Sequence, residues 1–160
     1  MDENEDRLTR LKDERVLRER LPIELMRAAS YEHVLSLLLI RVEVPSNWRA
    51  AAFYPLLKGV ARKVRQNVRA IDFAVRLGDD VVLMLAETPG AGAKRLGEKL
   101  TEVVDSSEFD IGLDLAVVRP LLRFATATFP EDAAEADALI AAVRAKIDAP
   151  EEVVADEPAL

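Results

Sequence analysis

Two short groups of residues near the middle of this 160-residue chain could bind a ligand or a metal ion. Arg69 and Asp72 form an Arg-x-x-Asp pair. A guanidinium can donate parallel hydrogen bonds to guanine O6 and N7 or to a phosphate, and a carboxylate can accept from guanine N1 and N2. The second group is Gly78-Asp79-Asp80, in which a carboxylate could hold a metal ion. The elements around both groups decide whether either chemistry is available.

The stretch that carries both groups is typical of a β-hairpin. Apolar runs on either side flank Gly78-Asp79-Asp80, and Gly beside Asp is a strong turn signal. A helix expected from about Ala50 to Val68 leads into it, with an apolar face and a basic face. Residues 58–76 hold six basic side chains and one acidic one, a local charge of +5 in a chain of net charge −7. A local basic patch on an acidic protein suits a small anionic ligand better than a nucleic acid.

The order of the other elements predicts the fold class. A nearly continuous apolar run over residues 34–44 is typical of a central strand that is covered on both faces. The pattern also predicts helices over 13–32 and 91–104, a loop over 105–112, strands over 113–118 and 121–129, and a last helix opened by Pro130-Glu131-Asp132. We therefore expect an α+β sandwich whose central, mostly antiparallel sheet is flanked by helices. It would form one domain over residues 1–148, followed by an acidic, disordered tail over 149–160.

The composition excludes several kinds of site. The chain has no cysteine and only one histidine, His33, so disulfides, thiolate chemistry and histidine-cluster metal sites are excluded. No stretch approaches the roughly 20 apolar residues of a membrane span, and the acidic N-terminus lacks the apolar segment of a signal peptide. We expect a cytoplasmic protein with no membrane partner.

Four motifs, in order, give the chain a resemblance to a known family. They are Asp6-Arg7-Leu8-Thr9-Arg10-Leu11, the helix and strand around Glu24–Ile40, Arg69-x-x-Asp72-x-x-x-Arg76-Leu77-Gly78-Asp79-Asp80-Val81, and Thr128-Phe129-Pro130-Glu131-Asp132-Ala133. In this order and spacing they resemble the GGDEF domain of diguanylate cyclases, whose signature reads R-x-x-D-x-x-x-R-Y-G-G-D-E-F. The resemblance covers nearly the full length and implies the nucleotide-cyclase-like form of the α+β sandwich.

The same resemblance implies that the catalytic positions are altered. The family's D-x-D metal motif is Arg41-Val42-Glu43 here, and a cation at Arg41 would repel Mg²⁺. Gly78-Asp79-Asp80-Val81 aligns best with one glycine deleted, which matches Asp79 and Asp80 to the two acids; without that gap only Asp80 matches an acid. The guanine-binding segment has no counterpart in residues 45–50. We expect an inactive domain without a Mg²⁺ cofactor, in which Asp79 and Asp80 are weak metal candidates.

The family's inhibitory site is the part that the resemblance implies is retained. In that site an R-x-x-D binds cyclic di-GMP, and Arg69 and Asp72 stand at those positions, with Arg65, Arg76 and Lys99 as further candidate ligand-binding residues. We expect a cyclic di-GMP receptor or regulatory module in bacterial signalling, able to form a homodimer or to dock an unidentified protein partner. Two alternatives are a ligand-independent interaction module, whose surface would be the basic helix or the acidic tail, and an enzyme with residual GTP chemistry.

Overall fold

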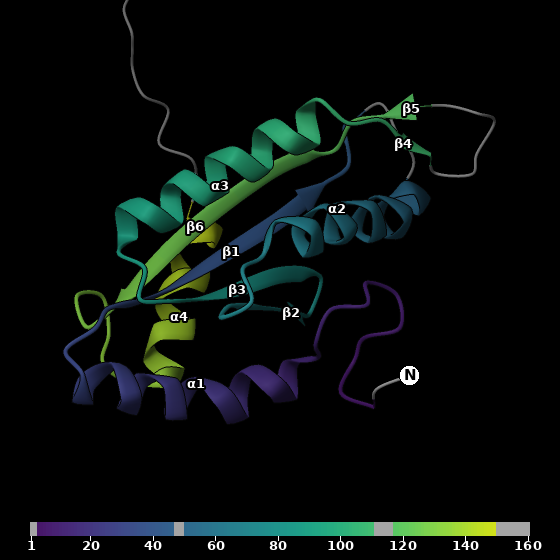
Figure 1. Cartoon of the computed structure of the whole chain (residues 1–160). Helices are drawn as coiled ribbons and strands as arrows, with labels where there is room; N and C mark the ends of the chain where they lie inside the picture. The colour runs from purple at the N-terminus through teal and green to yellow at the C-terminus, as the bar shows by residue number, and fades with distance from the viewer. Residues whose placement is uncertain (1–2, 47–49, 111–116, 150–160) are drawn as a thin grey trace, which may run out of the picture.

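A computed structural model describes residues 3–46, 50–110 and 117–149, and these form a sheet covered by helices on both faces (Figure 1). The sheet has the strand order β2-β3-β1-β6, and every neighbouring pair is antiparallel. Its strands are β1 (Leu35–Glu43), β2 (Phe73–Leu77), β3 (Asp80–Ala86) and β6 (Leu121–Phe129). The four helices are α1 (Glu14–Ser30), α2 (Phe53–Asn67), α3 (Gly90–Asp105) and α4 (Ala136–Asp148). A short 3-10 turn, η1 (Ala50–Ala52), precedes α2, and β4 (Phe109–Asp110) pairs with β5 (Val117–Val118) in a second, two-stranded sheet.

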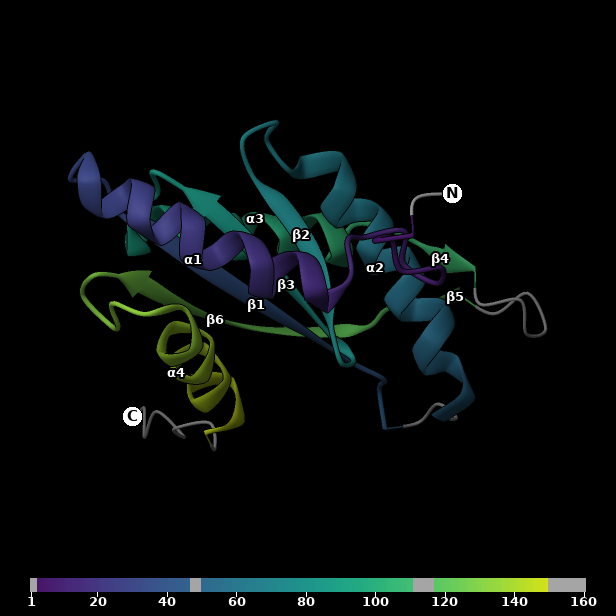
Figure 2. The ribbon, with the colours of Figure 1, turned by 90° about the horizontal axis from the view of Figure 1, so that it is seen from below.

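The helices divide between the two faces of the sheet. Buried residues of α2 and α3 pack on one face, and buried residues of α1 and α4 pack on the other (Figure 2). Alternate residues of β1 enter the two clusters: Leu38 and Ile40 face α2 and α3, whereas Leu37 and Leu39 face α1 and α4. A strand that is buried on both faces needs apolar residues throughout, which explains the continuous apolar run. The predicted α+β sandwich with a mostly antiparallel sheet is confirmed.

The hairpin also forms as predicted. Leu77 pairs with Asp80, so β2 and β3 are joined by a two-residue loop of Gly78 and Asp79. Gly78 has a φ of 64°, a left-handed backbone conformation that side chains with a Cβ rarely adopt. The turn therefore favours glycine at this position.

Two element boundaries differ from the sequence-based expectation. The last helix begins at Ala136, because Asp132 closes a turn instead: its N–H donates to the Thr128 carbonyl (2.7 Å) and its carboxylate accepts from the Thr128 N–H (2.8 Å). The expected loop over 105–112 contains β4, because Phe109 pairs with Val118 of β5. Residues 111–116, which span the end of the predicted loop and most of the strand predicted over 113–118, lie outside the described residues, as do residues 150–160 of the predicted tail.

None of the helices in the described part of the chain is both long and apolar enough to cross a membrane.

Candidate functional site

The Arg-x-x-Asp pair lies in the turn between α2 and β2, where the aspartate anchors the arginine. The Asp72 carboxylate accepts from Arg69 Nε (2.6 Å) and Arg69 Nη2 (3.1 Å), and also from the backbone N–H of Ala86 (3.0 Å) at the end of β3. The Asp72 side chain is only 1% exposed, whereas that of Arg69 is 54% exposed. Asp72 is thus a positioning residue that fixes Arg69 against the sheet.

Further contacts hold the Arg69 guanidinium in one orientation. Its Nη2 also donates to the Ala86 carbonyl (3.1 Å) and to Thr88 Oγ1 (2.7 Å). Among the contacts within the described residues, Nη1 is the guanidinium nitrogen without a hydrogen bond. The hydrogen bond to Asp72 raises the pKa of Arg69 above its ordinary value, although partial burial opposes this. Arg69 is therefore a permanently charged donor whose Nη1 can donate a hydrogen bond to a ligand.

Arg69 and Asp72 line a pocket of about 390 Å³ together with the N-terminal half of α3. Lys99, predicted from the sequence, lines the same pocket, and so does Arg95, which the sequence reasoning missed. Arg95 lies one helical turn before Lys99, and residues four apart share a helix face. That spacing is the sequence signal that could have identified Arg95 as a further pocket residue. Glu87 is the other charged lining residue besides these three cations and Asp72.

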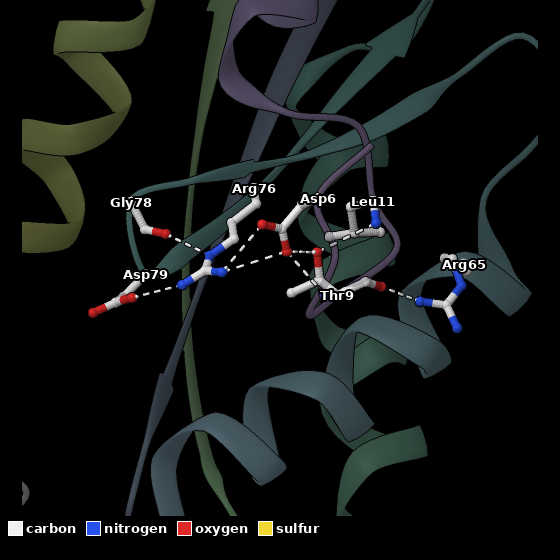
Figure 3. A network of polar contacts seen from close by, with 7 residues as sticks. All are labelled: Asp6, Thr9, Leu11, Arg65, Arg76, Gly78 and Asp79. Carbon is white, nitrogen blue, oxygen red and sulfur yellow. Dashed lines mark hydrogen bonds and ion pairs between the residues drawn. The ribbon is translucent and has the colours of Figure 1, made fainter. Parts of the chain in front are cut away.

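The other two arginines expected at this site from the sequence do not line the pocket and contact the N-terminal segment instead (Figure 3). Arg76, near the hairpin end of β2, donates to the Gly78 carbonyl (2.8 Å) and pairs with Asp79 (3.1 Å) and Asp6 (3.2 Å). Arg65, on α2, donates to the Thr9 carbonyl. The N-terminal segment folds back over α2 and the hairpin and supplies the acceptors for both arginines. Arg65 and Arg76 therefore hold this segment in place.

The opening Asp-x-x-Thr motif forms the centre of that contact. The Asp6 carboxylate accepts from the Thr9 N–H (2.8 Å) and Thr9 hydroxyl (2.7 Å), and Arg76 approaches the same carboxylate. Burial raises the pKa of Asp6, but the hydrogen bonds from Thr9 and the charge of Arg76 outweigh it, so the pKa lies below its ordinary value. The motif therefore clamps the N-terminal segment to the hairpin (Figure 3).

The position of the family's metal motif holds an ion-pair network. Arg41 of β1 is the cross-strand partner of Asp80 in β3, and its Nε and Nη2 bond both carboxylate oxygens of Asp80 (3.0 and 2.9 Å). Its Nη1 bonds Asp148 at the end of α4 (2.7 Å). The hydrogen bonds to Asp80 and then to Asp148 raise the pKa of Arg41. The guanidinium thus neutralises the carboxylate that could otherwise hold a cation.

These residues do not fit a metal ion. Both acids of the hairpin are paired with arginines, Asp79 with Arg76 and Asp80 with Arg41. Glu43 lies near another arginine, with Arg123 Nη1 3.8 Å from its carboxylate. Within residues 3–46, 50–110 and 117–149, no three His, Cys, Asp or Glu side chains gather as a metal-binding group. Half of the segment expected to carry the guanine pocket, residues 47–49 of 45–50, lies outside the described residues.

A helix-covered antiparallel sheet with an Arg-x-x-Asp turn before a central hairpin is the architecture of a nucleotide-cyclase-like signalling domain. The family model for the GGDEF domain of diguanylate cyclases matches residues 3–149, and the chain belongs to this family. No protein with a curated function matches it in sequence.

Solved structures agree with this assignment. The GGDEF domain of TpbB (YfiN) from Pseudomonas aeruginosa is 25% identical, with a TM-score of 0.80 over 89% of this chain and 86% of that one. The GGDEF domain of DgcB from Caulobacter crescentus, solved with c-di-GMP, is 14% identical, with a TM-score of 0.80 over 92% and 86%. Diguanylate cyclase SiaD from P. aeruginosa, solved with its activator SiaC, is 22% identical, with a TM-score of 0.70 over 91% and 60%. The chain is similar to GGDEF domains that bind c-di-GMP or a protein activator.

Proposed function

We propose that this GGDEF domain has lost cyclase chemistry and acts as a receptor or regulatory module for cyclic di-GMP. The observation that carries the proposal is the Arg69 pocket: a preoriented guanidinium with one free nitrogen shares a cavity with Arg95 and Lys99. Three cations around one pocket suit a ligand with two phosphates.

Each pocket residue has a distinct part in this proposal. Arg69 Nη1 donates to guanine O6 or N7 or to a phosphate oxygen. Arg95 and Lys99 neutralise phosphate charge from α3. Asp72 holds Arg69 from beneath, and its 1% exposure makes it a positioning residue instead of the direct guanine acceptor that the family resemblance implies.

The loss of cyclase activity is argued from Arg41. Phosphoryl chemistry of this kind requires metal ions close to the triphosphate, and a guanidinium bonded to Asp80 places a positive charge in that position. The complex of DgcB with c-di-GMP supports the choice of ligand. Binding at an exposed pocket edge would let the ligand contact a second copy or a protein partner as well.

Isothermal titration calorimetry with cyclic di-GMP tests the proposal directly. We expect saturable heat for the wild type and roughly a tenfold or greater loss of affinity for Arg69→Ala, because a charge-assisted hydrogen bond and the preoriented donor are both removed. Arg95→Ala should weaken binding by less, since it removes phosphate neutralisation alone.

Arg144→Ala is the matched control, because Arg144 is an exposed arginine of α4 on the other face of the sheet. It should bind as the wild type does. Absence of heat with the wild type at saturating cyclic di-GMP, or conversion of GTP with Mg²⁺ to cyclic di-GMP, would contradict the proposal.

A further inference from the structure

One face of α2 carries a row of cations that the ligand pocket does not use. Lys58, Arg62 and Arg65 follow each other at spacings of four and three residues, so they share one helix face over about 10 Å. All three are exposed, and we refer to them as the basic strip. Exposed Tyr54 continues the same face one turn earlier.

The basic strip differs from most arginines of the protein in having no acidic partner. Arg18, Arg41 and Arg76 each pair with at least one carboxylate. In the part of the chain that the structure describes, no carboxylate forms an ion pair with any residue of the strip. The helix α2 itself contains no acidic residue. The described part of the chain therefore leaves these three cations without an ion-pair partner, although the charge of Glu5 acts on Arg65.

The surroundings of Arg65 show that its positive charge is held against repulsion. Burial lowers the pKa of Arg65, and the charges of Arg10 and Arg62 lower it further, whereas the charge of Glu5 opposes this shift without outweighing it. The donation of Arg65 to the Thr9 carbonyl fixes the side chain at the edge of the N-terminal segment (Figure 3). An anion on the strip would relieve this repulsion, and a fixed side chain loses less conformational entropy on binding.

We propose that the basic strip docks an acidic peptide segment of a partner protein. Acidic side chains recur about 5–6 Å apart along a helix face and about 7 Å apart along an extended strand, and both spacings match neighbouring cations of the strip. A straight row suits several separated carboxylates, whereas one compact anion needs donors that converge on a point. Because the whole chain has a charge of −7, nonspecific attraction of an acidic peptide is disfavoured.

Fluorescence anisotropy with a labelled oligoglutamate peptide and the full-length protein provides the test. We expect saturable binding at low ionic strength that weakens as salt is added. Arg62→Glu should reduce the affinity roughly fivefold, since it replaces an attraction by a repulsion. Arg144→Glu makes the same change of net charge at an exposed position of α4, and it should reduce the affinity less than twofold.

Three results would overturn the proposal. The first is no saturable binding by the wild type at low salt. The second is an equal loss of affinity for Arg62→Glu and Arg144→Glu, which would mean that net charge alone determines binding. The third is displacement of the peptide by tripolyphosphate at a concentration lower than that of unlabelled oligoglutamate, which would make the strip a compact-anion site. Arg69→Ala should leave peptide binding unchanged, which separates this surface from the cyclic di-GMP pocket.

The chain's own acidic end is a further possible occupant that the same assay distinguishes. In a variant of the 160-residue chain, the four acids of this end are replaced by the corresponding amides. They are Glu151, Glu152, Asp156 and Glu157, which lie outside the described residues. Unchanged affinity for oligoglutamate supports an external partner. A severalfold gain in affinity would show that this segment already covers the strip, and would overturn the proposal of an external partner.

Discussion

At the scale of single residues, Arg41 is the partner that holds the hairpin carboxylate of Asp80. Its guanidinium takes the place next to Asp80 that a metal ion would need, and its third contact reaches Asp148 of α4. Asp80 is 14% exposed and would carry an unpaired charge without this partner. The arginine therefore has a structural role, because it joins β1, β3 and α4.

Arg41→Ala should lower the free energy of unfolding by about 1–3 kcal/mol, because the half-buried Asp80 carboxylate loses its bidentate partner. Urea unfolding followed by circular dichroism measures this change. Arg18→Ala is the control, since it breaks an exposed pair with Glu14, whose side chain is 44% exposed, and a longer contact with the 96% exposed side chain of Asp137 (3.7 Å). That pair should be worth at most about 0.5 kcal/mol. Equal losses for the two variants would mean that the Arg41 network contributes no more than a surface ion pair.

At the scale of elements, α3 positions two pocket cations and packs closely on β6. Gly97 lies between Arg95 and Lys99, and a Cβ there would lie 2.5, 2.6 and 2.8 Å from three ring carbons of Phe124. Phe124 is partly buried and packs against the core, so its rigid ring cannot retreat as the end of a flexible side chain can. The close approach of α3 to the sheet thus depends on this glycine.

Gly97→Ala should destabilise the protein by about 1–3 kcal/mol, since the overpacking cost exceeds the helix-propensity gain of at most about 1 kcal/mol. Displacement of α3 should also weaken cyclic di-GMP binding. Gly92→Ala on the same helix is the control: a Cβ there would make one tight contact, 3.1 Å from Thr88 Cγ2, and no contact under 3.0 Å. Urea unfolding of both variants checks the difference, and a Gly97→Ala protein as stable as Gly92→Ala would disprove the close-packing argument.

The parts of the fold and of the candidate site that could be predicted from the sequence are those set by interactions between residues close together in the chain. The hairpin at Gly78 and the central strand β1 follow from local turn and hydropathy patterns, and both form as predicted. The contacts of Arg65 and Arg76 were not predicted, because their partners Thr9 and Asp6 are more than fifty residues away in the sequence. Such a contact depends on how the N-terminal segment folds back, which no local pattern of charge reveals.

At the scale of the whole molecule, the N-terminal segment completes the edge of the sheet. The Lys12 N–H donates to the Ala74 carbonyl (3.1 Å) and the Arg76 N–H donates to the Lys12 carbonyl (2.9 Å), so one residue of the segment pairs with the edge strand β2. The Asp6 clamp holds the same segment against the hairpin. An edge that would otherwise expose its backbone is partly covered.

The Asp6 clamp makes stability depend on pH in a defined direction. Because the pKa of Asp6 is lower in the folded state than its ordinary value, the folded protein binds this proton more weakly than the unfolded chain does. The contribution of the carboxylate is complete above its ordinary pKa of about 4 and is lost as the pH falls through the lower folded value. Asp6→Asn should therefore lower the free energy of unfolding by about 1 kcal/mol near neutral pH, and its difference from the wild type should shrink below about pH 4. Urea unfolding across this range measures that difference. A difference that grows on acidification would show that Asp6 is held by something other than the hydrogen bonds and charge that Thr9 and Arg76 provide.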